Sequence, residues 1–261
     1  DVDYPKFVSS RYFSLSNLID STIFKGFLRY DGNNIIVNSG EKGERKAIAT
    51  LYKNNRKYIN IESDRFFVGQ QSFNAYEAGV SIYIGEKDSI SHPSVSFRYN
   101  QNSGQFKLLA EKEEGRVMPY TNTYHKLDMY CRILNWNRKD KVIEFQSIQS
   151  MGVQEKAIFE SHDFYSERSY YKIQLMDRVN PLKHLHNIVK KKDKSSFTNE
   201  ELMEYTGKSA YQIDLLLVRL AKSGFLVYNR NSKTFRVKQK VHNYVQAKYG
   251  LGDYDEMRLI S

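Results

Sequence analysis

Histidines and carboxylates are the side chains of this sequence that could carry out acid–base or metal chemistry. His184 and His186 stand two positions apart in a segment with a helical pattern, so they point about 200° apart and are poorly placed to share a metal. No cysteine pair or second histidine pair stands at ligand spacing, so we expect no metal site. His125 and the pair His162–Asp163 lack a serine or cysteine nucleophile elbow, and we interpret each as an ordinary turn position.

Three glutamates form a dense carboxylate group in the stretch AEKEEGR. Glu111 and Glu113 would share one face of an extended strand, while Glu114 would point the other way. A carboxylate pair on one face suits acid–base catalysis, but the lysine, glycine and arginine around this pair predict a solvated turn. The sequence contains neither GxGxxG nor GxxxxGK[ST], the patterns that hold phosphates. We therefore predict a protein that is not an enzyme, with no catalytic residue and no cofactor.

Composition and charge limit the partners and the compartment only loosely. The chain has 40 Lys and Arg against 30 Asp and Glu, and a net charge of +10 permits attraction to nucleic acid, anionic lipid or an acidic partner. A solvated basic surface explains the same charge equally well. Cys131 is the single cysteine and is expected to be a small core residue. No apolar run is long enough for a transmembrane segment, and the missing N-terminal methionine indicates a piece of a longer protein.

From about Ser21 to Asp163, apolar residues recur with a period of two, which predicts β-strands. Turn residues such as Asp31-Gly32-Asn33 separate the strands, and the 20 Tyr and 15 Phe residues suit a pleated surface. The predicted strands are 22–30, 33–39, 46–53, 57–63, 79–86, 94–100, 105–111, 127–136, 141–148 and 156–162. Short strands at this spacing favour an antiparallel sandwich, a barrel or a solenoid layer.

The region 181–250 has a different pattern, with helix caps and helix breakers. Pro181 suits a first helical turn, and Thr198 with Glu201 forms a capping box. Further boundary signals are Gly207, Ser209 and Gly224. The order helix, short strand, helix, helix, strand, wing, strand resembles the winged helix-turn-helix family. We therefore predict an α+β fold, with a β-rich domain at 1–165, a linker at 166–180, a winged-helix-like domain at 181–250 and a tail at 251–261.

The helix predicted at 210–223 would be the DNA-reading helix of such a domain. Its outward face is centred on Tyr211, Leu215 and Val218, whereas a helix that enters the major groove presents polar and basic side chains. An outward apolar stripe favours contact with other protein. If the chain binds nucleic acid instead, the candidate residues are Lys222, Arg230, Lys233, Arg236 and Lys238. The acidic Glu200, Glu201 and Glu204 on the preceding helix oppose that alternative.

The stretches KDSISHPSVSFRYN and PYTNTYHKLDMYCRILNW, with the segment after VNPL, resemble part of a large, uncharacterised cell-envelope protein of Bacteroidetes-type bacteria. The resemblance covers the chain from roughly Ile23 onward. It implies an internal segment of a longer envelope protein, in the envelope or periplasm, and it implies no catalytic residues. A cytoplasmic location is the alternative.

Two hypotheses of function from different classes follow. The first is a non-enzymatic structural or protein-interaction module that contacts other segments or subunits of a larger assembly. The alternative is a DNA-binding transcriptional regulator with a β-rich sensor domain. A third possibility is a β-domain that binds carbohydrate or lipid through exposed tyrosine and phenylalanine side chains.

Overall fold

The structure is a computed structural model. It describes residues 6–31, 34–40, 45–113, 116–146, 149–150, 153–154, 156–175, 177–230, 232–255 and 257–261. The chain divides into two compact units. Unit 1 comprises Asp1–His125 and Cys131–Ala157, and unit 2 comprises Lys126–Tyr130 and Ile158–Ser261. The chain therefore enters unit 2 for five residues, returns to unit 1, and enters unit 2 again at Ile158.

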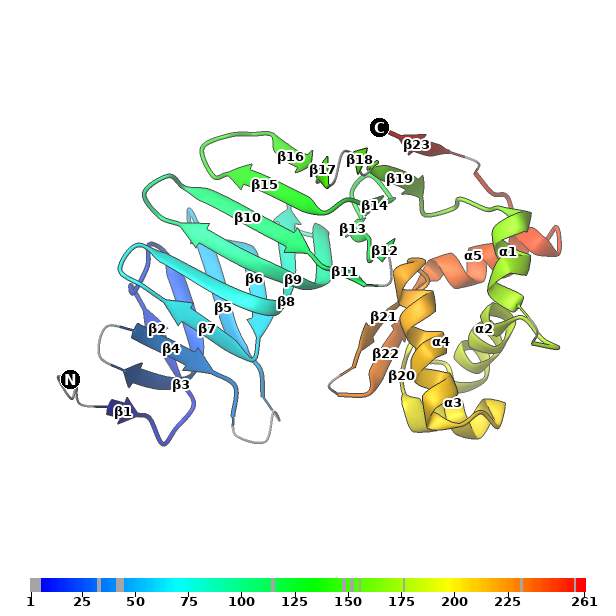
Figure 1. Cartoon of the computed structure of the whole chain (residues 1–261), viewed down its shortest axis with the longest axis horizontal. Helices are drawn as coiled ribbons and strands as arrows, with labels where there is room; N and C mark the ends of the chain where they lie inside the picture. The colour runs from blue at the N-terminus through cyan, green and yellow to red at the C-terminus, as the bar shows by residue number, and fades with distance from the viewer. Residues whose placement is uncertain are drawn as a thin grey trace. The chain divides into compact units, whose positions relative to one another are not determined.

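Unit 1 is built from antiparallel strands (Figure 1). They are β1 (Lys6–Val8), β2 (Phe13–Ser16), β3 (Thr22–Asp31), β4 (Asn34–Asn38), β5 (Ala47–Lys53), β6 (Arg56–Ser63), β7 (Arg65–Val68), β8 (Ser72–Ile84), β9 (Asp88–Asn100), β10 (Gln105–Ala110), β11 (Lys112–Glu113), β12 (Arg116–Val117), β13 (Tyr120–Asn122), β15 (Ile133–Asn137), β16 (Ile143–Gln146), β17 (Gln149–Ser150) and β18 (Val153–Gln154).

Six of these strands close into a ring. The pairings run β8–β6–β5–β3–β4–β7, and β7 pairs again with β8. The two halves of β3 pair with different neighbours, and the same is true of β8. Each of these long strands must therefore bend at a corner between its two halves. In β3 the corner is at Gly26, where an added Cβ would lie 2.5 Å from Val37 Cγ1. In β8 it is a bulge between Ala75 and Ala78.

Aromatic side chains fill the centre of unit 1. Phe24, Phe66 and Phe73 are fully buried inside the ring and meet edge to face, with centroid distances of 5.1–6.2 Å. The sheet continues from β8 through β9, β10, β15 and β16. Across it, Phe106 stacks on Tyr99 at 4.4 Å and on Trp136 at 5.4 Å. Buried tyrosine and phenylalanine side chains thus contribute the largest residues of the core of unit 1.

Unit 2 contains the helices that the structure describes, three antiparallel strands from the starts and the end of its two chain segments, and a separate three-stranded antiparallel sheet (Figure 1). The helices are α1 (Glu167–Gln174), α2 (Pro181–Lys192), α3 (Asn199–Thr206), α4 (Ala210–Lys222) and α5 (Gln239–Lys248). The strands are β14 (Leu127–Tyr130), β19 (Ile158–Ser161), β20 (Ser196–Thr198), β21 (Leu226–Asn229), β22 (Thr234–Val237) and β23 (Arg258–Ile260). Strands β14, β19 and β23 pair in that order, and β20–β22–β21 form the separate three-stranded sheet.

Local sequence signals set the helix ends in unit 2. Thr198 and Ser209 begin α3 and α4 with capping boxes, in which each hydroxyl accepts a bond from the backbone N–H three residues on. Gly207 ends α3 in the left-handed region, at φ 69°. Apolar residues of the helices form a core with Phe225 and Tyr244, which meet edge to face at 4.9 Å. None of the helices in the described part of the chain is long and apolar enough to span a membrane.

The expected fold class, an α+β chain that ends in a winged-helix domain, is wrong. The chain is mostly antiparallel β, with 47% strand and 22% helix, so the β-rich character alone is confirmed. The described helices have only 8 to 13 residues, and they share their unit with β14, β19 and β23. Caps determine where a short helix begins and ends, but they do not determine which distant strands pack beside it. The expected linker 166–180 contains α1, and the expected tail 251–261 contains β23.

Candidate functional site

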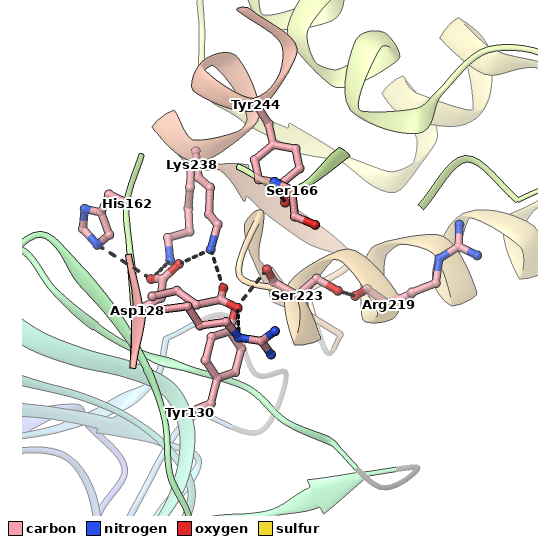
Figure 2. Close-up of polar contacts among 11 residues, drawn as sticks. Asp128, Tyr130, His162, Ser166, Arg219, Ser223, Lys238 and Tyr244 are labelled. Atoms are coloured by element: carbon pink, nitrogen blue, oxygen red, sulfur yellow. Dashed lines mark hydrogen bonds and ion pairs between the residues drawn. The ribbon is translucent and has the colours of Figure 1, made fainter. Parts of the chain in front are cut away.

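A cluster of charged side chains lies inside unit 2, around Asp128 on β14 (Figure 2). The Asp128 side chain is fully buried, and both of its oxygens are paired with ammonium groups. Lys238 Nζ lies 2.8 Å from Oδ1, and Lys240 Nζ lies 3.1 Å from Oδ2. A buried carboxylate needs such partners, because its desolvation is otherwise too costly.

A second carboxylate, Glu160 on β19, extends the cluster. It stands directly opposite Asp128 in the β14–β19 pairing, an arrangement in which two like charges repel. Lys240 Nζ relieves the repulsion, since it also lies 3.2 Å from Glu160 Oε2. On the other side, Arg258 of β23 places its Nε 3.3 Å from Glu160 Oε1. The charges therefore alternate across three strands and the start of α5.

The titration behaviour of the cluster follows from this geometry. Burial alone would raise the pKa of Asp128, but the ammonium groups of Lys240 and Lys238 outweigh it and lower that pKa. Burial lowers the pKa of Lys238, although Asp128 opposes the change. Burial also lowers the pKa of His162, whose Nε2 lies 3.7 Å from Asp128 Oδ1. The cluster thus holds an ionised carboxylate between two lysines, an arrangement that suits a fixed structural charge.

The predicted protein-contact residues lie on α4. Tyr211 is 74% exposed and Leu215 is 47% exposed, while Val218 is half-buried. Two polar bridges hold the end of α1 and the residues after it alongside this helix. Arg219 Nη2 donates to the carbonyl oxygen of Ile173 at 3.3 Å, and Lys208 Nζ lies 2.6 Å from Asp177 Oδ1.

In the sequence, Leu175 stands between the two bridged residues Ile173 and Asp177, and it is 63% exposed. Its backbone has a positive φ, at φ 51° and ψ −124°, a conformation that strains a leucine by about 1–3 kcal/mol. Along α4, Tyr211, Leu215 and Arg219 fall on one stripe, because side chains four residues apart share a face. Tyr211 and Leu215 are exposed on one face of α4, and the exposed Leu175 stands in the segment that is bridged to Lys208 and Arg219; we name these three apolar side chains the contact surface.

The predicted nucleic-acid residues are mostly engaged within unit 2. Arg230 and Lys233 reach Asp214 on α4 at 3.0 and 3.4 Å. A hydrogen bond from the Tyr228 hydroxyl, together with the Arg230 contact, lowers the pKa of Asp214. Lys222 is buried, Lys238 belongs to the cluster around Asp128, and Arg236 is exposed on β22. The structure therefore does not bring the five residues into one basic track.

The predicted chemistry-bearing residues are dispersed. His184 and His186 do not meet; instead His186 Nδ1 lies 2.8 Å from Nδ1 of His242 on α5. His125 lies in a turn beside Asn122, as its backbone N–H donates to Asn122 Oδ1. Asp163 accepts a hydrogen bond from the Asn243 side chain, Glu111 is exposed and Cys131 is buried. The Glu113 side chain and Glu114 lie outside the described residues.

The Cys131 thiol is unsuited to nucleophilic chemistry, because burial raises its pKa to about 12. Within the described ranges, no group of three or more histidine, cysteine, aspartate or glutamate side chains could hold a metal ion. Sequence reasoning missed the cluster around Asp128 and the His186–His242 pair. Lys238 and Lys240, two residues apart in VKQKV, were the available signal, yet they point to Asp128 only when β14 is placed beside them.

Comparison of the chain with known protein families, curated proteins and solved structures found no match.

Proposed function

We propose that this chain is a non-enzymatic interaction module of a larger assembly and that unit 2 binds another protein through the contact surface. The observation that carries the proposal is the exposure of Tyr211 and Leu215 on one face of α4, together with the strained, exposed Leu175. Exposed large apolar side chains in one patch are typical of protein–protein sites. Backbone strain also concentrates at functional positions. An envelope location, which the sequence resemblance implies, is part of the same proposal.

The partner that fits this surface is a protein segment with apolar anchors and acidic flanks. Lys172 and Arg178, on either side of Leu175, are exposed. A second copy of this chain fits less well, since each copy carries a net charge of +10 and two copies repel. Complementary charge around an apolar centre increases the association rate and the specificity of such a contact.

Site-specific photo-crosslinking in the cells that make the protein tests the proposal. Tyr211 is replaced by a photoreactive phenylalanine analogue, and Tyr254, which is 52% exposed elsewhere in unit 2, is replaced as the matched control. We expect a covalent adduct from position 211 alone, with a partner peptide that contains apolar and acidic residues. The adduct should disappear in Leu215→Glu, because a charge is then buried at the centre of the interface.

Reversal of the basic charges separates this proposal from DNA binding. Arg230→Glu, Lys233→Glu and Arg236→Glu, combined in one variant, should leave the adduct unchanged. The opposite pattern would contradict the proposal: no adduct specific to position 211, together with binding of duplex DNA in a mobility-shift assay at low salt that the triple variant abolishes.

A further inference from the structure

The corner bulge of β8 turns two consecutive side chains outward. Tyr76 and Glu77 are both exposed, while Ala75 and Ala78 on either side are buried. A regular strand alternates, so one of the two side chains would otherwise point into the core. Here Glu77 adopts φ 49° and the register shifts at this point. Bulges that redirect side chains recur beside binding sites as well as at corners.

A hollow of about 520 Å³ adjoins the bulge on unit 1. Small-molecule sites have volumes of about 300–1,000 Å³. Besides Tyr76 and Glu77, the residues that give the hollow its chemistry are Asn38, Asp64, Arg65 and Phe67. They come from the ends of β4, β6 and β7, which meet β8 at this corner.

The walls of the hollow are fixed by contacts among their own residues. The Tyr76 ring is 60% exposed and meets Phe67 edge to face at 6.1 Å. The Arg65 guanidinium lies 5.9 Å from the Phe67 ring centre, and its Nε donates to Asn38 Oδ1 at 3.2 Å. The Ser63 hydroxyl, also in the lining, donates to the Tyr76 carbonyl oxygen at 2.9 Å and ties the bulge to the end of β6.

We infer that this hollow is a binding site for a neutral carbohydrate, in which one pyranose ring lies against Tyr76. A pyranose has a face of C–H groups that suits an aromatic ring, and a rim of hydroxyls that each donate and accept hydrogen bonds. The hollow offers an aromatic face with planar amide, guanidinium and carboxylate groups around it. These are the donors and acceptors that such a rim requires.

The charge balance favours a neutral ligand over a cation. Asp64 and Glu77 contribute two negative charges, but Arg65 is also in the lining and Lys46 Nζ lies 2.7 Å from Asp64 Oδ1. An aromatic site for a quaternary ammonium ion would need uncompensated negative charge or a closed aromatic cage. The site is independent of the contact surface, which lies in unit 2.

Saturation-transfer NMR on the full chain tests this site, with methyl glycosides of glucose, galactose, mannose and N-acetylglucosamine as probes. At least one glycoside should receive saturation, and Tyr76→Ala should weaken its binding by about tenfold or more. Tyr124→Ala is the matched control, because Tyr124 is also a 60% exposed tyrosine of unit 1 and should leave binding unchanged. Glu77→Gln, which keeps the size of the side chain, should weaken binding without loss of folded structure by circular dichroism.

Three outcomes overturn the inference. One is the absence of saturation transfer to every glycoside. Another is equal weakening by the Tyr76 and Tyr124 variants, which would place the sugar elsewhere. The third is binding of tetramethylammonium with no glycoside signal, which would make the hollow a cation site.

Discussion

Replacement of Asp128 by asparagine should strongly destabilise unit 2. The variant keeps the size of the side chain but removes the negative charge that Lys238 and Lys240 share. Loss of one partner of a buried ion pair typically costs about 3–5 kcal/mol, because the remaining charge stays buried. Lys240 retains Glu160 at 3.2 Å, and Lys238 is partly exposed, so we expect the lower end of this range, about 3 kcal/mol.

Urea unfolding followed with two signals measures this effect. Trp136 is the only tryptophan and lies in unit 1, whereas the described helices lie in unit 2. Tryptophan fluorescence therefore reports on unit 1, and the helical circular dichroism band reports on unit 2. With a slope of about 1–3 kcal/mol per molar urea, a loss of about 3 kcal/mol should lower the midpoint of the helical transition by about 1–3 M. The midpoint of the fluorescence transition should stay in place.

An exposed ion pair in the same unit provides the control. Lys194→Met removes the pair with Glu201, whose Nζ and Oε1 atoms are 2.6 Å apart on side chains that are 44% and 30% exposed. This loss should cost about 1 kcal/mol or less. A change in Asp128→Asn no larger than that of the control would refute the buried-pair argument, and so would an equal shift of the fluorescence transition.

Two further predictions concern pH and the corner of unit 1. Burial lowers the pKa of four histidines of unit 2 in the folded state: His162, His184, His186 and His242. Below about pH 6.5 the unfolded chain therefore binds more protons than the folded chain. The urea midpoint of the helical transition should fall as the pH drops from about 7 to 5.5, and it should fall less steeply in His162→Gln. A midpoint that does not change with pH would contradict this prediction. In unit 1, Gly26→Ala places a Cβ 2.5 Å from Val37 Cγ1 and 2.8 Å from the Asn38 oxygen. The substitution should lower the free energy of unfolding of unit 1 by about 1–3 kcal/mol and shift the fluorescence transition alone. An unchanged midpoint would show that the backbone at the corner moves to make room for the methyl group.

Local chemistry made several features predictable from the sequence. The helix caps at Thr198 and Ser209 depend on residues three positions apart, so four consecutive residues contain the whole signal. Period-two patterns located strands because one face of each strand is buried. The core position of Cys131 followed from the alternating run around it.

Long-range pairing explains what the sequence did not reveal. The run 127–136 reads as one strand, yet it divides at Cys131, with β14 in unit 2 and β15 in unit 1. Lys238 was predicted as a nucleic-acid candidate. Its actual partner, Asp128, is 110 residues away, and the sequence does not show that the two meet. The bulge at Tyr76 carries no glycine or proline of its own, so nothing local marked it. Gly26, within the run predicted as one strand at 22–30, lies at a corner of the ring.

The separation of Asp128 from its lysines also has a consequence for synthesis on the ribosome. The carboxylate emerges 110 residues before Lys238 and 112 before Lys240. At about 5–20 residues per second, roughly 5 to 20 seconds pass before either ammonium group exists. During that interval β14 carries a charge that it cannot bury, so it must stay in solvent while β15 and its neighbours are made. Unit 2 is therefore completed late, and its assembly waits for the start of α5.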